Sequence, residues 1–324
     1  MSQLSENSFE SSQPPSAFGL FFSLFSGQWR PGEFWNQRSF RRKFMLRSLL
    51  MPRLSREWMG ELSQWSNLNI LLARQPRLPV RLHRPYLVVN FNRHQVLEAL
   101  RYHYTLLSEV MSSEESATYL NTQALPLANV EGKNGDMFTF ELTMQVNLDK
   151  EGDSTILMRN SDGDVLAEMT FSIIAYENKR TLFIGGLQGG KRDLPHEAIQ
   201  NATKSCHGLF PKRLVMEAVC RFAERLQVEQ ILAVSNEVHI FRGERYQDKN
   251  KKILSDYDTF WAAVGGELFR FRYGYHRCAN GTTVQGIAFL HYHQHVAGSN
   301  FIRLNHRNRL MNVRVHRDID VRNN

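Results

Sequence analysis

Cysteine is scarce in this chain, and the spacings that cysteine-based chemistry requires are missing. The 324 residues contain three cysteines, Cys206, Cys220 and Cys278, which are far apart and form no CxxC pair. Structural zinc sites and dithiol redox centres use closely spaced pairs, so the sequence favours neither. Separated cysteines in an odd number also favour a reducing compartment over a disulfide-linked fold.

Long hydrophobic runs are missing too. A membrane-spanning helix needs roughly 20 apolar residues, whereas the apolar patch at 20–25 is far shorter. Glu6 and Glu10 stand where a secretory signal carries basic residues, and no small-residue cleavage site follows the patch. We therefore expect a cytoplasmic protein, and peripheral attachment at the inner membrane remains open.

Several catalytic signatures are also missing. The chain contains no GxxxxGK[ST], GxGxxG, GxSxG or HExxH sequence. These patterns mark phosphate loops, dinucleotide sites, serine hydrolases and zinc proteases, respectively. None of these four classes of enzyme is indicated by its usual motif.

Charge is present, but it is unevenly distributed. The net charge of +8 combines +7 over residues 28–56 and +7 over 270–324 with −6 over 85–269. Basic ends attract phosphate through long-range fields. The expected partner is an anionic membrane surface or a phosphorylated lipid precursor. Nucleic acid is less favoured, because no helix-turn-helix, zinc or RNA-binding motif accompanies the charge.

Hydrophobic periodicity divides the chain into a helical part and a part rich in strands. Before residue 115, apolar residues recur at the spacing of helices, and after Gly135 they alternate as in strands. The predicted helices are 37–50, 54–75 and 92–111 with Asn92 as a cap, and a strand is predicted at 86–90. Four antiparallel strands are then predicted between Gly135 and Gly190.

Helices and strands follow the four-strand meander. The pattern predicts helices at 195–205 and 211–226, a buried strand at 230–235, a helix capped by Ser255, and strands at 267–273 and 283–292. The expected fold class is α+β, an antiparallel meander sheet with packed helices after an N-terminal helical section. The element order is also that of the acetyltransferase fold. The predicted divisions are a disordered tail at 1–28, a basic, aromatic-rich helical section at 29–115, an α+β core at 116–293 and a basic tail at 294–324.

The helix predicted at 37–50 has two interpretations. Phe40, Phe44, Leu46 and Leu50 recur near helical spacing, with basic residues on the other side. Such a helix can lie in a headgroup layer with its aromatic face down. Alternatively, the phenylalanines pack on the body of the protein.

The stretch FIGGLQGGKR ends with a glycine pair beside cations. Backbone N–H groups at Gly189 and Gly190, next to Lys191, can approach and bind a phosphate group closely. The alternative is that paired glycines permit only a bulge or a tight turn.

A second candidate binding segment is HGLFPKR, at the start of the helix predicted at 211–226. Helix N-termini attract anions, so Gly208, Lys212 and Arg213 form a candidate phosphate site, although most helix starts bind nothing. With the element order, these residues support an acyltransferase hypothesis in which an acyl-CoA or acyl carrier is the cofactor.

Asp256 and Tyr257 are the candidate catalytic residues. They stand at the start of a predicted helix, where a carboxylate and a phenol can transfer protons. Acidic residues are also common in a first helical turn for capping alone. His291, His293 and His295 alternate as in some metal sites, but no ligand cluster accompanies them, and no metal is predicted.

Long motifs in a fixed order resemble the VirK/YbjX family of Gram-negative bacteria, over about residues 30–290. They are RPYL at 84–87, the HY pair within 102–104, TLFIGGLQGGKR at 181–192, ATKSCHGLFPKRLVMEAV at 202–219, ILAVSN at 231–236 and SDYDTFWAAVGG at 255–266. The C-terminal segment departs from the family, because relatives end in a denser basic and tyrosine-rich stretch.

The resemblance implies a virulence-associated protein that supports envelope integrity and resistance to cationic antimicrobial peptides. The family carries no established catalytic activity. The alternative is an acetyltransferase-like acyltransferase that acts on an envelope or lipid precursor.

Overall fold

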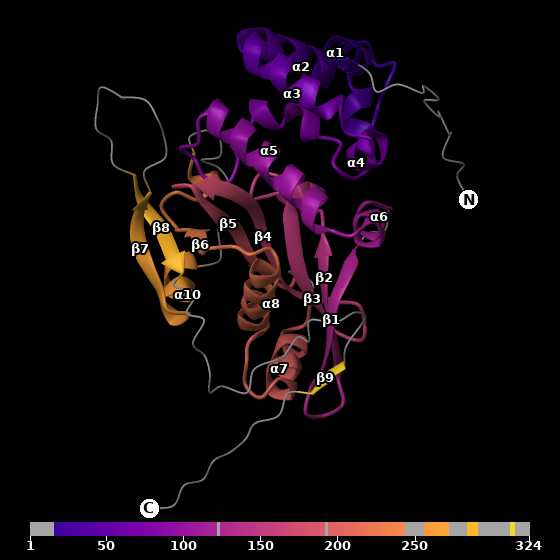
Figure 1. Cartoon of the computed structure of the whole chain (residues 1–324). Coiled ribbons are helices and arrows are strands. Elements are labelled where there is room, and N and C mark those ends of the chain that lie inside the picture. Colours follow the sequence, from indigo (N-terminus) through magenta and orange to yellow (C-terminus); the bar gives the residue numbers. More distant parts are fainter. Residues whose placement is uncertain are drawn as a thin grey trace, which may run out of the picture. The chain divides into compact units, whose positions relative to one another are not determined.

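The computed structural model describes residues 16–121, 124–191, 194–243, 256–271, 284–290 and 312–314. Contacts group the chain into two compact units, residues 1–83 and 84–324. The first unit contains helices, and the second contains a sheet with helices (Figure 1). The fold is therefore α+β with N-terminal helices, as the hydrophobic pattern predicts.

The N-terminal unit is built from helices around buried aromatic rings. Trp35 and Trp58 are fully buried, and their indole N–H groups donate to the carbonyls of Pro76 and Leu78. Buried indoles need such partners, so these two bonds fix the segment at residues 76–78 to the core. The elements of the N-terminal unit are α1 (Ala17–Ser26), η1 (Glu33–Asn36), α2 (Arg38–Leu50), α3 (Pro52–Leu62), α4 (Leu68–Arg74) and η2 (Leu78–His83).

Helix α2 turns its aromatic side inward. The Phe44 ring is buried and lies 5.0 Å from the ring of Phe21 and 5.2 Å from that of Trp35. Arg41 is also buried, and its guanidinium donates to the carbonyls of Phe25, Trp35 and Asn36. The interpretation that places the phenylalanine face in a headgroup layer is therefore wrong for Phe44, because that face forms the core of the unit.

The helix predicted at 54–75 is two helices. Helix α3 ends at Leu62, where the Ser63 hydroxyl donates to the carbonyl of Gly60 at 2.7 Å. Such local side-chain bonds compete with helix continuation. Helix α4 begins only at Leu68, after the turn that contains Asn67.

The second unit is organised by one mostly antiparallel sheet. Within the described residues its order is β7-β8-β6-β5-β4-β3-β2-β1-β9, and only the pairs β5–β6 and β1–β9 are parallel (Figure 1). Strand β4 pairs with β5 from Ala167 to Tyr176 in the longest hairpin. The bounds are β1 Leu125–Glu131, β2 Met137–Thr143, β3 Ser154–Arg159, β4 Val165–Tyr176, β5 Lys179–Gly189, β6 Gln230–Val234, β7 Gly266–Phe271, β8 Val284–Leu290 and β9 Asn312–Arg314.

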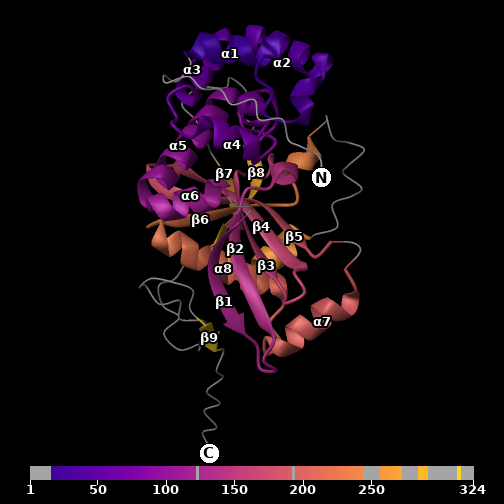
Figure 2. The same ribbon diagram turned by 90° about the vertical axis from the view of Figure 1, so that its right-hand side faces the viewer.

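Helices pack on the centre of this sheet. Helix α5 (Arg93–Val110) contacts β4, and α8 (Pro211–Arg225) lies across β3, β4 and β5 (Figure 2). The predicted cap is confirmed, because Asn92 and Gln95 form a reciprocal capping box at the start of α5. The other elements are α6 Ser113–Asn121, η3 Val146–Leu148, α7 His196–Ser205, η4 Ile240–Arg242 and α10 Tyr257–Ala263.

Two local predictions in this unit are wrong. Residues 86–90 form no strand, because Leu87 has a left-handed φ of 59° that turns the chain, leaving only isolated bridges at Val88. The cap of α10 is Asp256 rather than Ser255, and the Asp256 side chain accepts from the Thr259 N–H. Both differences shift the local geometry while leaving the order of the elements unchanged.

Candidate functional site

The parallel strands β5 and β6 stop pairing halfway along β5. Their register runs from Thr181 to Ile184 on β5, whereas β5 continues to Gly189 on its β4 side. The N–H of Leu187 lies past that point and donates to the Tyr257 hydroxyl at 3.3 Å. The last five residues of β5 thus offer a strand edge that a side chain of α10 meets.

A glycine pair lets another chain segment lie directly on β5. A β-carbon at Gly185 would lie 2.0 Å from the carbonyl oxygen of Glu151, and one at Gly186 would lie 1.9 Å from its Oε2. Atoms cannot approach that closely, so Gly185, which meets backbone, requires glycine, and a side chain at Gly186 would displace the carboxyl group of Glu151. The first glycine pair of FIGGLQGG therefore accommodates a carboxyl group of the protein itself.

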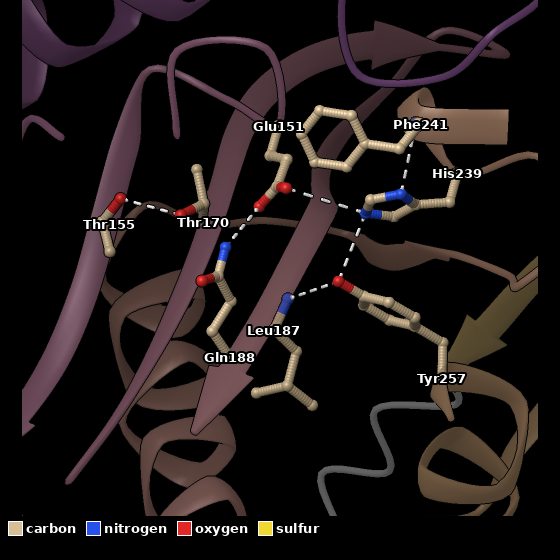
Figure 3. A network of polar contacts seen from close by, with 8 residues as sticks. All are labelled: Glu151, Thr155, Thr170, Leu187, Gln188, His239, Phe241 and Tyr257. Atoms are coloured by element: carbon tan, nitrogen blue, oxygen red, sulfur yellow. Dashed lines mark hydrogen bonds and ion pairs between the residues drawn. The ribbon is translucent and has the colours of Figure 1, made fainter. Parts of the chain in front are cut away.

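Glu151 begins a buried polar network that reaches α10 (Figure 3). Gln188 Nε2 donates to Glu151 Oε2 at 3.3 Å, and His239 Nε2 lies 3.7 Å from Glu151 Oε1. The same ring nitrogen lies 3.2 Å from the hydroxyl of Tyr257. Glu151 and His239 are each 2% exposed, so water contributes little to this network.

Burial keeps the network uncharged near neutral pH. Desolvation raises the pKa of Glu151 to about 8 and lowers that of His239 to about 4. Desolvation, with a smaller contribution from Glu151, also raises the pKa of Tyr257 above its usual value. The contact between Glu151 and His239 is therefore one between neutral groups rather than an ion pair, since separating charge there would be costly.

The tautomer of His239 follows from its second ring nitrogen. The N–H of Phe241 donates to Nδ1 at 3.4 Å, so in the neutral ring Nε2 carries the proton. That proton faces the hydroxyl of Tyr257 and the carboxyl of Glu151. The polar contacts among Glu151, His239 and Tyr257 can therefore polarise and strengthen one another while all three side chains stay neutral.

Two further acidic residues of the same turn are buried beside Glu151. Asp149 accepts from Arg84 at 2.6 Å, and Asp153 accepts from the hydroxyls of Tyr86 and Tyr104. Asp149, Glu151 and Asp153 alternate along a short segment between two strands, and the sequence pattern does not predict that all three are buried.

The two predicted phosphate segments meet at one point. A β-carbon added to Gly189 would lie 3.5 Å from Cε of Lys212, so the end of β5 adjoins the start of α8. Lys212 is half-buried, and desolvation lowers its pKa. The other members of the two segments, Lys191, Gly208 and Arg213, are exposed.

Gly190 and Gly208 have different local reasons to be glycine. A β-carbon at Gly190 would lie 2.3 Å from Cδ2 of Leu194, so this glycine accommodates a neighbouring leucine. Gly208 has a left-handed φ of 85° and faces open space. Gly208 is therefore a glycine because of its backbone conformation, which a residue with a β-carbon rarely adopts.

Asp256 acts as a helix cap. Its carboxylate is exposed and accepts from Thr259 and from the side chain of Asn236, and these bonds lower its pKa to about 2. The bonds from Thr259 are those of a cap, the bond from Asn236 ties the cap to the loop after β6, and among the described residues the contacts of this carboxylate indicate a structural role. Tyr257, in contrast, reaches β5 through Leu187.

Asp256→Ala is expected to lower the melting temperature by a few degrees, because α10 loses its cap. Asp256→Asn should retain most of the stability, since an amide oxygen also caps. Thermal unfolding followed by circular dichroism measures both variants. Equal losses for Ala and Asn would contradict a capping role and point to a need for the charge.

The two cysteines of the described region are not activated thiols. Burial raises the pKa of Cys206 and of Cys220 to about 12. Nucleophilic cysteines have a depressed pKa instead, so neither is suited to covalent catalysis. Cys278, Arg192 and the three alternating histidines at 291, 293 and 295 lie outside the described residues.

No helix in the described parts of the chain is both long and apolar enough to cross a bilayer.

Comparison with known proteins identifies relatives over most of the chain. Uncharacterized protein YbjX of Escherichia coli (strain K12) is 67% identical over 266 residues, which cover 82% of this chain and 81% of YbjX.

Two uncharacterized proteins of Haemophilus influenzae match shorter parts. One is 30% identical over 125 residues, which are 39% of this chain and 40% of that protein. The other is 30% identical over 92 residues, which are 27% of this chain and 29% of that protein. Residues 33–279 match the family described as "Protein of unknown function (DUF535)". The chain therefore belongs to the DUF535 family, the VirK/YbjX family that its sequence motifs resemble.

Proposed function

We propose that this protein is an acyltransferase that takes an acyl group from a phosphorylated thioester carrier, acyl-CoA or acyl carrier protein. The observation that carries the proposal is the strand order β5-β6-β8-β7, in which a parallel pair joined through α7 and α8 is followed by antiparallel strands. This is the element order of the acetyltransferase fold. Fold alone does not determine chemistry, and the groups at the end of β5 provide the further support.

The start of α8 is suited to the phosphate of such a carrier. Two cations, Lys212 and Arg213, occupy the first turn, which has no acidic residue and no side-chain cap. The positive end of a helix attracts an anion, and cations in the same turn add to that attraction. Gly189, next to Lys212, leaves room for the carrier to pass from the helix to the strand.

Beyond the helix, the edge of β5 can hold the arm of the carrier. The arm is extended and contains amides, and strand edges bind such chains by main-chain hydrogen bonds. The edge past Ile184 pairs with no strand in the described part of the chain. Tyr257 lies beside this edge, which brings its hydroxyl to the region where the thioester would lie.

The reaction is a substitution at the thioester carbonyl. A hydroxyl or amine of the acceptor attacks the carbonyl carbon, the new bond forms, and the carbon–sulfur bond breaks. The proton of the acceptor passes to solvent, the departing thiolate takes a proton from solvent, and the hydroxyl of Tyr257 donates a hydrogen bond to the departing sulfur. The raised pKa of Tyr257 keeps this hydroxyl protonated, so it acts as a hydrogen-bond donor to the developing charge rather than as an acid.

The acceptor that we propose is an envelope or lipid precursor. The resemblance to VirK/YbjX proteins implies a role in envelope integrity and in resistance to cationic antimicrobial peptides. Acylation of a phosphorylated lipid precursor at the inner membrane is one chemical route to such resistance. The partner is then an anionic lipid, in agreement with the basic segment at 28–56.

Lys212→Ala/Arg213→Ala is expected to weaken carrier binding at least tenfold, because the carrier's phosphates lose both cations. Isothermal titration calorimetry of the full chain with CoA, acetyl-CoA and a long-chain acyl-CoA measures this, and acyl carrier protein is tested in parallel. Lys179→Ala is the matched control, since this exposed lysine lies at the opposite end of β5. No binding of any carrier, or equal binding by the double variant, would contradict the proposal.

A further inference from the structure

Large apolar side chains are exposed on two neighbouring helices of the N-terminal unit. Helix α1 exposes Phe18 and Phe22, and α2 exposes Leu46, Leu49 and Leu50, with Leu50 83% exposed. The two helices pack on each other through the rings of α1 and Phe44 of α2. Grouped exposure of this kind marks an interaction surface, whereas single exposed apolar residues do not.

On α2 the leucines share one face with a cation. Arg42, Leu46, Leu49 and Leu50 follow the helical spacing of three and four residues and are all exposed. The opposite face, which contains Phe44, is buried in the unit. The exposed leucines therefore do not belong to the hydrophobic core, and packing within this unit does not explain why they are apolar.

Charge identifies what covers this face. Between residues 16 and 83 the unit contains eleven Lys and Arg side chains and three Glu, a net charge of +8. Neither α1 nor α2 contains an acidic residue, and Arg38, Arg42 and Lys43 are exposed at the start of α2. Exposed leucines flanked by cations, with no carboxylate among them, are complementary to an anionic lipid bilayer, in which negatively charged headgroups cover apolar acyl chains.

Helix length excludes a spanning arrangement for α2. It has 13 residues, five of which are basic. A spanning helix needs roughly 20 mostly apolar residues. A short helix with leucines on one face and cations beside them is suited to lying in the plane of the interface.

We infer that the exposed face of α2, aided by Phe18 and Phe22 of α1, docks on an anionic phospholipid bilayer. Leu46, Leu49 and Leu50 enter the headgroup layer, and Arg38, Arg42 and Lys43 contact phosphates. This inference deepens the proposed function by naming the surface that brings the protein to a lipid. It depends on these side chains and not on acyl transfer.

Vesicle cosedimentation of the full chain tests the inference. Vesicles of phosphatidylcholine alone are compared with vesicles that also contain phosphatidylglycerol, at low and high salt. Binding is expected only with the anionic lipid and is expected to weaken with salt. Binding that is equal with neutral vesicles, or no binding at all, would overturn the inference.

Two variants locate the surface. Leu46→Ser/Leu49→Ser/Leu50→Ser and Arg38→Glu/Arg42→Glu/Lys43→Glu are each expected to reduce vesicle binding at least tenfold. Their melting temperatures should stay near that of the natural chain, because all six side chains are exposed. Phe210→Ser is the matched control, since Phe210 is an exposed apolar residue of the other unit.

Two further measurements distinguish membrane docking from self-association and test this inference independently of the proposed function. If the leucine variant keeps full vesicle binding but loses self-association in sedimentation velocity, a second copy covers the face and the inference is wrong. CoA binding by both variants should be unchanged. Loss of vesicle binding with CoA binding intact supports the surface alone, whereas failure of CoA binding in the natural chain affects only the proposed function.

Discussion

Gly185→Ala is expected to destabilise the sheet unit by about 3 kcal/mol or more. The added β-carbon would lie 2.0 Å from the carbonyl oxygen and 2.8 Å from the carbonyl carbon of Glu151. These are backbone atoms, so no side-chain rotation relieves the overlap. Urea unfolding followed by circular dichroism measures the loss.

The segment that contains Glu151 cannot move aside easily. Its backbone is held by the bonds of Leu87 N–H to the Lys150 carbonyl at 2.7 Å and of Asp153 N–H to the Phe171 carbonyl at 3.2 Å. Gly189→Ala on the same strand is the control. The nearest atom there is Cε of Lys212 at 3.5 Å, an ordinary contact, so little loss is expected. Similar losses for the two variants would show that Glu151 does not lie on β5 as described.

Glu151→Gln is expected to change how stability depends on pH. The pKa of Glu151 is about 8 in the folded protein against an ordinary value of 4.5. Between these values the unfolded chain is ionised while the folded protein keeps its proton, so stability falls as pH rises from 4.5 to 8. Glutamine cannot ionise, and the fall should disappear in the variant.

His239 acts in the opposite direction over part of this range. Its pKa is about 4 in the folded protein against 6.5, so the unfolded chain binds the extra proton and stability rises as pH rises from 4 to 6.5. The two effects offset each other between pH 4.5 and 6.5. Above pH 6.5 only the contribution of Glu151 remains, roughly 2 kcal/mol of lost stability by pH 8.

Urea unfolding at pH 6.5, 7 and 8 measures the difference between the natural chain and Glu151→Gln. The variant should become the more stable protein as pH rises, by roughly 2 kcal/mol across the interval. Glu237→Gln, at an exposed site, is the control and should follow the natural chain. A constant difference between Glu151→Gln and the natural chain would mean that Glu151 is ionised in the fold.

Periodicity and capping predict most of the fold from the sequence. Asn92 marks the start of α5 because its side chain bonds within four residues of itself, a purely local signal. Strands β2 to β5 are predicted because alternation is local as well. Strand β1 is not predicted, because Pro126 and a register shift between Pro126 and Ala128 interrupt its alternation.

Long-range contacts account for what the sequence did not predict. Glu151 and His239 are 88 positions apart and meet only because the turn before β3 and the loop after β6 both reach β5. Nothing local distinguishes a buried acidic turn from an exposed one. The approach of Gly189 to Lys212 likewise depends on tertiary packing, because the crossover between β5 and α8 brings the two residues together.

The exposed leucines of α2 show the same limit. The sequence predicts an amphipathic helix, but it contains two apolar strips, one through Phe44 and one through Leu46 and Leu50. Which strip faces the core depends on Trp35 and Phe21, which pack against Phe44. Only the tertiary structure identifies the strip that remains exposed.

Amide hydrogen exchange with and without an acyl-CoA tests the proposed carrier site most directly. Slower exchange on binding is expected at 185–190 and in the first turn of α8, at Lys212–Leu214, with other strands of the sheet unchanged. Protection confined to other regions, or no change at saturating ligand, would contradict a carrier site at the end of β5.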